Sequence, residues 1–398
     1  MSSFTNAQEV TMNIKRLLKD FAYQNLALGF EDAFALGQYA LYGCEGDSES
    51  HRLAQFQSIA ALCALHTKAT YQSDLASQQI AGICAAVFIE DIGKSKFGFL
   101  KPNIDYAMDN CGMGGDLIVT ANVSTTAALI AATADIPMCK HGSPANADQG
   151  RHGSSDFVSL LGISTTSDKD SVEQCLEETS FAYTEALDTR YKKIHMQTHK
   201  IAMLPHMNDI IGPITNPLDP SILSRRVLGA NHLISPRVLA EAYSTLNSRD
   251  ITNLRHGLFV RGFGDDTETG MDEVSLCLMG TQVVELRDGE ILEYHLSAES
   301  FGLEPVPAWS ISPPAGMSKG DFSLSILRGE VSGPPLQMVL ANAALLFYLA
   351  GHSHNLRDCY QIAKEVHESG RPFEKVMEVK KHLPVADDVS LETADVDS

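Results

Sequence analysis

The residues best suited to bind a charged ligand begin with the run Gly112-Met113-Gly114-Gly115-Asp116. Asn122 and the pair Ser124-Thr125 follow, at the start of an alanine-rich stretch that predicts a helix. Glycines let a backbone come close to a ligand, and a helix start offers unpaired N–H groups beside the two hydroxyls. This succession predicts a cradle for phosphate oxygens, although a glycine cluster alone is also typical of a tight turn.

A second polar group is Lys140-His141-Gly142-Ser143, at the expected end of a short strand. A lysine at the carboxyl end of a parallel strand can reach over the sheet edge, where α/β folds bind ligands. The alternative is an ordinary solvated lysine. Gly153-Ser154, at the start of the next expected helix, offers a further anion site or a plain helix cap.

An acidic pair, Asp272-Glu273, follows Gly270-Met271 on an expected loop. Adjacent carboxylates are hard oxygen ligands that suit Mg²⁺, an ion that usually keeps waters and bridges to substrate phosphates. Most Asp-Glu pairs are only solvated surface. The pair by itself therefore leaves both interpretations open.

The composition limits the class of function. The 398 residues are enough for two lobes and a large core, and 44% hydrophobic with 20% charged residues is ordinary for a globular enzyme. A net charge of -20 argues against general nucleic-acid binding but leaves room for a local cationic pocket. Eight scattered cysteines without a Cys-x-x-Cys pair favour a reduced, cytoplasmic chain over a zinc or disulfide protein. No apolar stretch is expected to act as a signal peptide or to span a membrane.

The elements that must position these residues indicate an α/β fold class, with a small all-helical lobe packed on a larger α/β lobe. Apolar residues recur at helical spacing within 33–41, 53–63 and 80–87, which predicts a helical lobe over residues 1–104. Polar segments at 43–50 and 67–72 are expected to separate its helices. From about residue 105, short segments that end in glycine alternate with alanine-rich helices, which predicts an α/β lobe over 105–380 with a mostly parallel sheet.

Four elements are expected early in the second lobe: a helix at 124–134, a strand at 137–140, a long polar loop at 141–153 and a helix over 171–191. Helices from about 177–205 are expected to complete the first lobe. Asp288-Gly289 between two alternating runs is a strong hairpin signal. Proline, asparagine and glycine delimit two late helices, at 334–351 and 355–370. The acidic tail, 383–398, is expected to be disordered.

Six blocks occur in the order Gly-x-Gly-Gly-Asp, Asn-x-Ser-Thr, Lys-His-Gly, Gly-Ser-Ser-Asp, Gly-Pro-x-Thr-Asn-Pro and Asp-Glu. The fifth block is Gly212-Pro213-Ile214-Thr215-Asn216-Pro217. In this order the blocks resemble those of the anthranilate phosphoribosyltransferase family, a glycosyltransferase family with a nucleoside phosphorylase-like fold. The resemblance covers most of the chain from about residue 105, whereas the first lobe is similar in pattern only.

The resemblance implies a helical lobe docked on an α/β lobe and a homodimer in which the helical parts meet. It also implies Mg²⁺-dependent transfer from phosphoribosyl diphosphate to an aromatic amine such as anthranilate, as in tryptophan biosynthesis. Ser124, Asp272 and Glu273 would bind Mg²⁺, and Lys140 would act with the acidic pair in catalysis. The implied substrate-binding residues are Gly112, Gly114, Gly115, Asp116, Asn122, Ser124, Thr125, Lys140, His141, Gly142, Ser143, Ser154 and His199.

In the implied mechanism, no covalent nucleophile is needed. Diphosphate leaves C1 of the ribose while Mg²⁺ and Lys140 stabilise the departing charge, and the acceptor nitrogen attacks from the opposite face. Catalysis then comes mostly from positioning and electrostatics.

The acceptor half departs from the family pattern. The family has Asn after Lys-His-Gly, where this chain has Ser143. An ungapped count from Gly212 places His199, with Lys200 beside it, at the family's arginine for the anthranilate carboxylate, and Thr189 at a family histidine. A neutral histidine cannot hold a carboxylate bidentately as arginine does. The donor half therefore matches the family better than the acceptor half.

Other interpretations remain open at this point. A non-catalytic relative that binds nucleic acid or another partner would use the basic stretch 190–200 with Arg225 and Arg226. A nucleoside phosphorylase would need neither a diphosphate nor the acidic pair. In the long loop 262–269, Asp265 and Asp266 are either metal ligands or a solvated loop tip.

Overall fold

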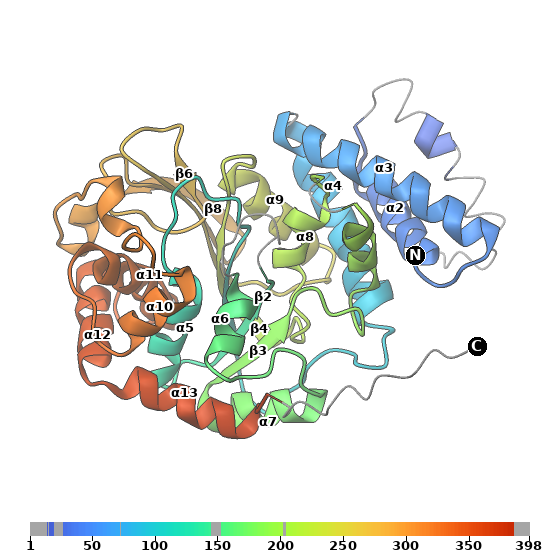
Figure 1. Cartoon of the computed structure of the whole chain (residues 1–398). Coiled ribbons are helices and arrows are strands. Elements are labelled where there is room, and N and C mark those ends of the chain that lie inside the picture. The colour runs from blue at the N-terminus through green and yellow to red at the C-terminus, as the bar shows by residue number, and fades with distance from the viewer. Residues whose placement is uncertain are drawn as a thin grey trace.

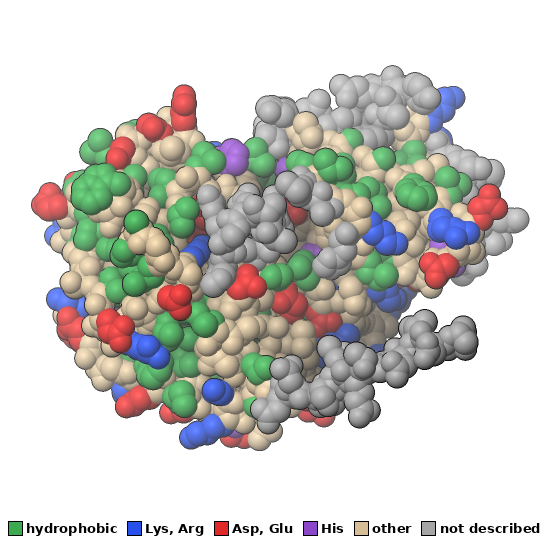
Figure 2. Space-filling view, in the orientation of Figure 1, with side chains coloured by type: hydrophobic (Ala, Val, Ile, Leu, Met, Phe, Trp, Pro, Cys, Tyr) green, Lys and Arg blue, Asp and Glu red, His purple; other side chains and the backbone are tan. Residues whose placement is uncertain are grey.

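The computed structural model describes residues 14, 16–19, 27–71, 73–144, 153–201 and 204–385, with the side chains at 68–71, 73, 74 and 199 outside this description. The fold is α/β: helices cover both faces of a central sheet, and a group of helices packs at one side (Figure 1). On the face shown in Figure 2, Lys and Arg side chains are dispersed among Asp and Glu side chains. The predicted fold class is confirmed.

One eight-stranded sheet forms the centre of the described chain, in the order β3-β2-β1-β4-β5-β7-β8 with β6 paired to β5. The strands are β1 (Ala107–Gly112), β2 (Met138–Gly142), β3 (Phe181–Glu185), β4 (Leu223–Gly229), β5 (His256–Phe263), β6 (Gly270–Met271), β7 (Thr281–Arg287) and β8 (Glu290–Leu296). The neighbours β3, β2, β1, β4 and β5 pair in parallel. The pairs β5–β7 and β7–β8 are antiparallel. Asp288 and Gly289 turn between β7 and β8 with φ of 48° and 91°, which confirms the predicted hairpin.

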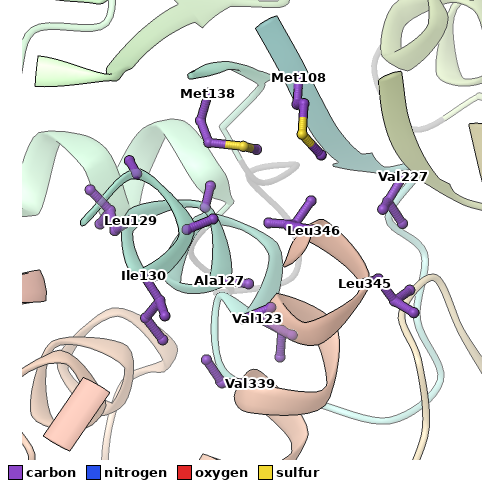
Figure 3. Close-up of a cluster of buried hydrophobic side chains, with 14 of the residues drawn as sticks. Met108, Val123, Ala127, Leu129, Ile130, Met138, Val227, Val339, Leu345 and Leu346 are labelled. Carbon is purple, nitrogen blue, oxygen red and sulfur yellow. The ribbon is translucent and has the colours of Figure 1, made fainter. Parts of the chain in front are cut away.

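One face of the sheet packs against α5 and α11 and the helices around them. These elements are α5 (Val123–Thr133), α6 (Ser154–Leu160), α7 (Lys169–Thr179), η3 (Ala298–Phe301), η4 (Ala308–Ile311), α10 (Lys319–Leu327), α11 (Pro334–Ala350), α12 (Leu356–Glu368) and α13 (Arg371–His382). Figure 3 shows Ala127 of α5 and Leu346 of α11 beneath Met108 and Val227 of the sheet. The buried alanines give α5 a narrow surface, so α11 packs close beside it.

The opposite face packs against α9, which lies between the sheet and α4. The elements on this side are α2 (Phe30–Gly43), α3 (Glu49–Tyr71), α4 (Ser73–Ala86), the π-helical η1 (Val87–Ile92), the 3₁₀ helix η2 (Lys193–Lys200), α8 (Asn208–Ile214) and α9 (Pro236–Asn247). Leu228 and Phe259 of the sheet belong to the same buried cluster as these helices. Within the described residues, Leu75–Ile92 is apolar and long enough to span a membrane, but 78% of it is buried inside the fold. Its position is that of a core helix.

Most predicted helices and strands are confirmed, but two predictions are wrong. The polar segment at 67–72 is largely helix, because α3 runs to Tyr71 and α4 begins at Ser73. The helix predicted over 171–191 ends at Thr179, where Ser180 adopts a left-handed φ of 60°. The chain then forms β3, whose five buried residues pair with β2. Pairing with a distant strand outweighs the helical pattern of the segment.

The predictions about the lobe boundary, the polar loop and the acidic tail fall partly on residues outside the described ranges. From the range expected to complete the first lobe, η2 contacts α2, and α8, which follows it, contacts α4. The division of the chain at residue 104 stays a prediction. Residues 145–152 of the polar loop and 386–398 of the acidic tail lie outside the described residues.

Candidate active site

Three neighbouring strands end in glycine at the carboxyl edge of the sheet: β1 at Gly112, β2 at Gly142 and β4 at Gly229. A Cβ atom on Gly112 would lie 2.0 Å from Oδ2 of Asp272, and one on Gly229 would lie 1.7 Å from the Asp272 carbonyl oxygen. A Cβ atom on Gly142 would lie 1.9 Å from Oγ of Ser154. The absence of side chains at the three glycines thus lets Asp272 and Ser154 close over the strand ends.

The predicted phosphate loop and the predicted acidic pair meet at this edge. The N–H of Gly114 donates to Oδ2 of Asp272 at 2.5 Å, and the N–H of Asp272 donates to Oδ1 of Asp116 at 2.8 Å. The hydroxyl of Thr120 donates to Oε2 of Glu273 at 3.1 Å. Gly114 and Gly115 have φ of 71° and 79°, a conformation that favours glycine.

The carboxyl groups of this edge are buried close to one another. Asp272 is 8% exposed and Glu273 is 6% exposed, so neither is the solvated surface residue of the alternative interpretation. Burial raises the pKa of Asp272, and burial together with the charge of Asp272 raises the pKa of Glu273 to about 8. Burial and the charges of Asp272 and Glu273 raise the pKa of Asp116 well above its usual range. A cation would relieve this crowding of negative charge.

The donor set fits Mg²⁺ that is shared with a ligand. Among the described residues, no three His, Cys, Asp or Glu side chains are grouped so that they alone could hold a metal ion. Magnesium usually takes one or two carboxylates and completes its shell with waters and substrate phosphates, which is what Asp272 and Glu273 would allow.

The start of α5 keeps polar groups available beside the acidic pair. Asn122 precedes the helix without capping it by its side chain, and its N–H donates to Oγ of Ser323 at 2.7 Å. Asn110 supports the backbone by donating to the carbonyl oxygen of Ser124 at 2.7 Å. The Oγ1 atom of Thr125 is buried and has no hydrogen-bond partner in the described chain. This helix start therefore retains the groups that the predicted phosphate cradle requires.

Lys140 and His141 lie inside the fold rather than on its surface. Lys140 is 1% exposed and its Nζ donates to the carbonyl oxygen of His141 at 3.2 Å, which excludes a solvated lysine. His141 contacts Oγ1 of Thr184 through Nδ1 at 2.9 Å and Nζ of Lys192 through Nε2 at 2.6 Å. Lys192 also donates to the carbonyl oxygen of Gly212 at 3.0 Å. Burial lowers the pKa of His141 well below its usual value and that of Lys192 to about 7.

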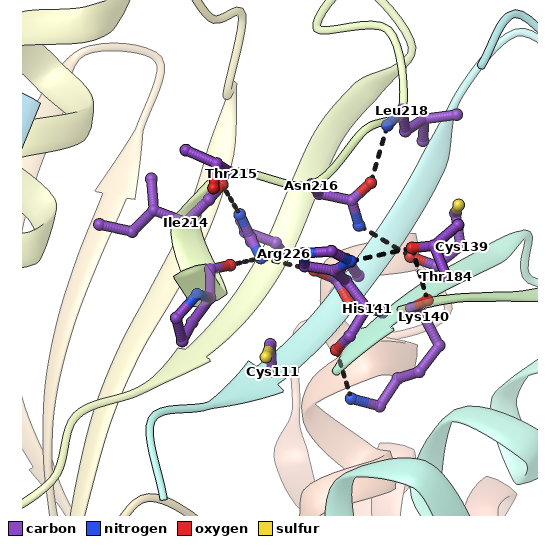
Figure 4. A network of polar contacts seen from close by, with 12 residues as sticks. Cys111, Cys139, Lys140, His141, Thr184, Ile214, Thr215, Asn216, Leu218 and Arg226 are labelled. Atoms are coloured by element: carbon purple, nitrogen blue, oxygen red, sulfur yellow. Dashed lines mark hydrogen bonds and ion pairs between the residues drawn. The ribbon is translucent and has the colours of Figure 1, made fainter. Parts of the chain in front are cut away.

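A buried ion pair joins the fifth sequence block to the sheet. Arg226 and Asp109 are 2.5 Å apart and both side chains are inaccessible to solvent. Figure 4 shows Arg226 reaching towards Ile214, while Asn216 donates to the carbonyl oxygen of Cys139 at 3.0 Å. Asp109 in turn accepts from the N–H of His141 at 3.2 Å. Arg226 therefore fixes the relative positions of three segments that border the site.

Ser154 and Ser143 are linked beside Gly142. Oγ of Ser154 lies 3.0 Å from the hydroxyl of Tyr183 and donates to the carbonyl oxygen of Ser143 at 3.3 Å. The N–H of Gly153 is bonded to Asp156 at 2.8 Å, so this helix start is already capped in part. The pattern of the sequence did not single out Tyr183, because it lies on the strand that was predicted as helix.

The residues predicted to bind the acceptor are described only in part. The backbone of His199 lies in η2, but its side chain is outside the described residues. Lys200 donates to Oε1 of Gln55 at 2.7 Å, and Thr189 is exposed. Asp265 accepts from the N–H of Ala308 at 3.1 Å, which braces its own loop and gives it a structural role.

Several other contributors were missed or misassigned from the sequence. Thr120, Thr184 and Lys319 carry no motif, and only their contacts with the named residues reveal them. Lys192 and Arg226 were counted with a basic stretch, yet each is at most 1% exposed. These two residues therefore cannot contribute to a surface patch for a polyanion, whereas Arg190 and Lys200 of the same stretch are exposed.

Comparison with known proteins agrees with this geometry. A family model described as "Glycosyl transferase family, a/b domain" matches residues 105–373. The anthranilate phosphoribosyltransferase of Haloferax volcanii is 31% identical over 273 residues, which cover 68% of this chain and 77% of that protein. The one from Anaeromyxobacter dehalogenans is 30% identical over 291 residues, covering 73% and 80%.

Solved structures share the fold over most of the chain. Anthranilate phosphoribosyltransferase from Thermus thermophilus superposes with a TM-score of 0.70 at 25% identity, covering 92% of this chain and 98% of that one. The Saccharomyces cerevisiae enzyme, in complex with PRPP and Mg, has a TM-score of 0.71 at 20% identity, covers 95% and 98%, and supports the fold alone. This chain belongs to the glycosyl transferase family that contains the anthranilate phosphoribosyltransferases, and it is a phosphoribosyltransferase.

Proposed function

We propose that this chain transfers the phosphoribosyl group of phosphoribosyl diphosphate, with Mg²⁺, to an aromatic amine such as anthranilate, as in tryptophan biosynthesis. The observation that carries this proposal is the contact between Asp272 and the glycine loop after β1, because it joins the predicted metal ligands to the predicted phosphate cradle. The curated relatives are anthranilate phosphoribosyltransferases, and the yeast structure holds PRPP and Mg.

The donor would lie across the carboxyl edge of the sheet. Asp272 and Glu273, with Ser124, would hold Mg²⁺, which supplies positive charge next to the leaving diphosphate. Gly115 and the hydroxyl of Thr125 would contact phosphate oxygens, since the Thr125 oxygen is buried and has no described partner. Asp116 would keep the acidic pair in place through the N–H of Asp272.

Lys140 would stabilise the charge that develops as diphosphate leaves. An ammonium group has three N–H donors, and one of these in Lys140 is directed to the carbonyl oxygen of His141. The other two can serve a ligand. Because Lys140 is buried, its charge acts with little screening by water.

The acceptor would bind beside Gly142, where the donor edge meets the helical side of the fold. The carbonyl oxygen of Ser143 accepts from the N–H of Ser155 at 3.2 Å and from Ser154, which positions Ser143 without engaging its hydroxyl. His141 would keep the backbone beside Gly142 in place through its contacts with Thr184 and Lys192. His199 is the candidate partner of an acceptor carboxylate.

We further propose a cytoplasmic homodimer formed through the helical lobe. All eight cysteines are free, as in a reducing compartment. Leu53 and Phe56 of α3 are 49% and 71% exposed, so this helix offers apolar surface to a second copy.

The test is calorimetric titration of phosphoribosyl diphosphate with and without Mg²⁺, followed by anthranilate and its fluorescence. Mg²⁺-dependent binding is expected, and it should weaken at least about tenfold in Asp272→Asn with Glu273→Gln. Asp47→Asn with Glu49→Gln, which removes the same charge from exposed positions, is the matched control. Equal binding by the first variant would contradict the metal site, and donor binding without fluorescence loss would remove anthranilate as the acceptor.

A further inference from the structure

A polar cavity lies at the edge of the sheet opposite the candidate active site, where the parallel strands begin. Its volume is about 480 Å³. The residues at its wall that matter here are Tyr106 before β1, Arg225 in β4, Arg255 and His256 at the start of β5, and Arg287 at the end of β7. The candidate active site lies where β1 and β4 end, so the length of these strands separates the two sites.

Strand pairing places three of these basic residues in one row. Arg225 of β4 is the register partner of His256 of β5, and His256 is the register partner of Arg287 of β7. Side chains of directly paired residues lie on the same face of a sheet. The row faces the side of the sheet that α11 covers, because the His256 ring packs edge-on against Tyr348 of α11 with ring centroids 5.5 Å apart. Arg255 adds a fourth basic group from the preceding loop.

The guanidinium groups of this cavity have no acidic partner. Within the described residues, no carboxylate oxygen lies within 4.0 Å of a side-chain nitrogen of Arg225, Arg255 or Arg287, although Asp105 and Asp288 also border the cavity. Other arginines do have such partners: Arg190, Arg226, Arg237 and Arg249. In a chain with 50 acidic and 30 basic residues, three arginines without carboxylate partners in one cavity create a local site for an anion.

Some of the neighbouring acceptor groups already have hydrogen-bond partners. Glu285 beneath the row accepts from the hydroxyls of two tyrosines and lies 2.6 Å from Nε2 of His256. In the last turn of α11, the carbonyl oxygens of Tyr348 and Phe347 accept from the N–H groups of Gly351 and His352. The guanidinium of Arg225 stacks on the ring of Tyr106 at 4.3 Å, which fixes its plane, and no described residue accepts a hydrogen bond from its N–H groups.

We propose that this cavity binds a small phosphate monoester, with Arg225 and Arg287 as its principal ligands and Arg255 at its side. A phosphate dianion matches the planar N–H fork of arginine and is balanced by two or three guanidinium groups. The volume is that of a metabolite site rather than of a single ion. The proposal does not depend on the function proposed above.

The test is calorimetric titration of the intact protein with glycerol 3-phosphate, with glycerol as the uncharged control. We expect saturable binding of glycerol 3-phosphate that weakens at least about tenfold in Arg225→Gln with Arg287→Gln, because two bidentate contacts are lost. Arg237→Gln with Arg357→Gln removes the same charge outside the cavity and is expected to bind as the unmodified chain does. No binding by the unmodified chain, or equal binding by both double variants, would overturn the proposal.

Two further variants separate this site from the candidate active site. Binding of glycerol 3-phosphate should persist in Asp272→Asn with Glu273→Gln, whatever the effect of that change on phosphoribosyl diphosphate. If the acidic double variant loses glycerol 3-phosphate binding while Arg225→Gln with Arg287→Gln keeps it, the anion binds at the carboxyl edge of the sheet. That result would overturn the proposal. If circular dichroism shows that the arginine double variant is unfolded, Arg255→Gln alone, at an exposed position, should weaken binding at least about threefold, and equal affinity would contradict the proposal.

Discussion

The N–H of Gly114 donates a hydrogen bond of 2.5 Å to Oδ2 of Asp272, across 158 positions of the chain. The bond holds a carboxylate that would bind metal against a loop that would bind phosphate. It requires that the strand before the loop ends without a side chain, because a Cβ atom on Gly112 would collide with the same carboxylate.

Gly112→Ala should therefore weaken Mg²⁺-dependent binding of phosphoribosyl diphosphate while the fold persists. The new Cβ atom would lie 2.0 Å from Oδ2 of Asp272, and the carboxylate would have to move. Calorimetry should show at least about a tenfold loss of affinity. Gly29→Ala is the control, because Gly29 has a φ of -71° and open space around its Cβ position. Unchanged affinity in Gly112→Ala would show that Asp272 does not need its present position.

Arg226→Met should destabilise the protein strongly. The change leaves Asp109 as an unpaired buried carboxylate and removes the donor to the carbonyl oxygen of Ile214. Loss of one partner of a buried pair costs about 3–5 kcal/mol of unfolding free energy. Arg237→Met, which breaks an exposed pair with Glu241, should cost no more than about 1 kcal/mol. Urea unfolding measures the unfolding free energy of both variants. Similar decreases in the two variants would mean that the buried ion pair stabilises the protein no more than the exposed one.

Lys192 should make folding stability rise with pH above neutrality. Burial lowers its pKa from 10.5 to about 7, so between these values the unfolded chain binds a proton that the folded chain does not. Stability from this group therefore increases as pH rises through that window. Lys192→Met should flatten the difference in unfolding free energy between pH 7 and pH 9, whereas Lys94→Met, at a position 65% exposed, should not. Parallel pH profiles of the unmodified chain and Lys192→Met would contradict the assignment.

Leu53→Glu with Phe56→Glu should convert the proposed homodimer into a monomer. The two side chains are 49% and 71% exposed on α3. A dimer interface formed by this helix would bury the two new carboxylates, which opposes association. Light scattering at several concentrations measures the change. Trp309→Glu, at a position 79% exposed in η4, is the control. A dimer that survives the α3 change would place the interface elsewhere.

Local sequence patterns determined many elements of this fold. The hairpin at Asp288-Gly289 and the late helices bounded by proline and glycine depend on backbone preferences that neighbouring residues impose. The strand β3 could not be predicted in this way, because its pairing with β2 is a contact between distant segments. The local pattern predicted a continued helix there instead, and pairing with a distant strand outweighed it.

The sequence by itself determined which residues of the site belong to the family pattern: the glycine loop, Lys140 and the pair Asp272-Glu273. Only the tertiary structure decided their environment. It buries Lys140, brings Asp272 against Gly112, and turns Lys192 and Arg226 from an apparent basic surface into internal supports. The physical reason is that burial and electrostatic environment depend on which segments the sheet brings together, and strand order across distant parts of the chain is not encoded in any local pattern.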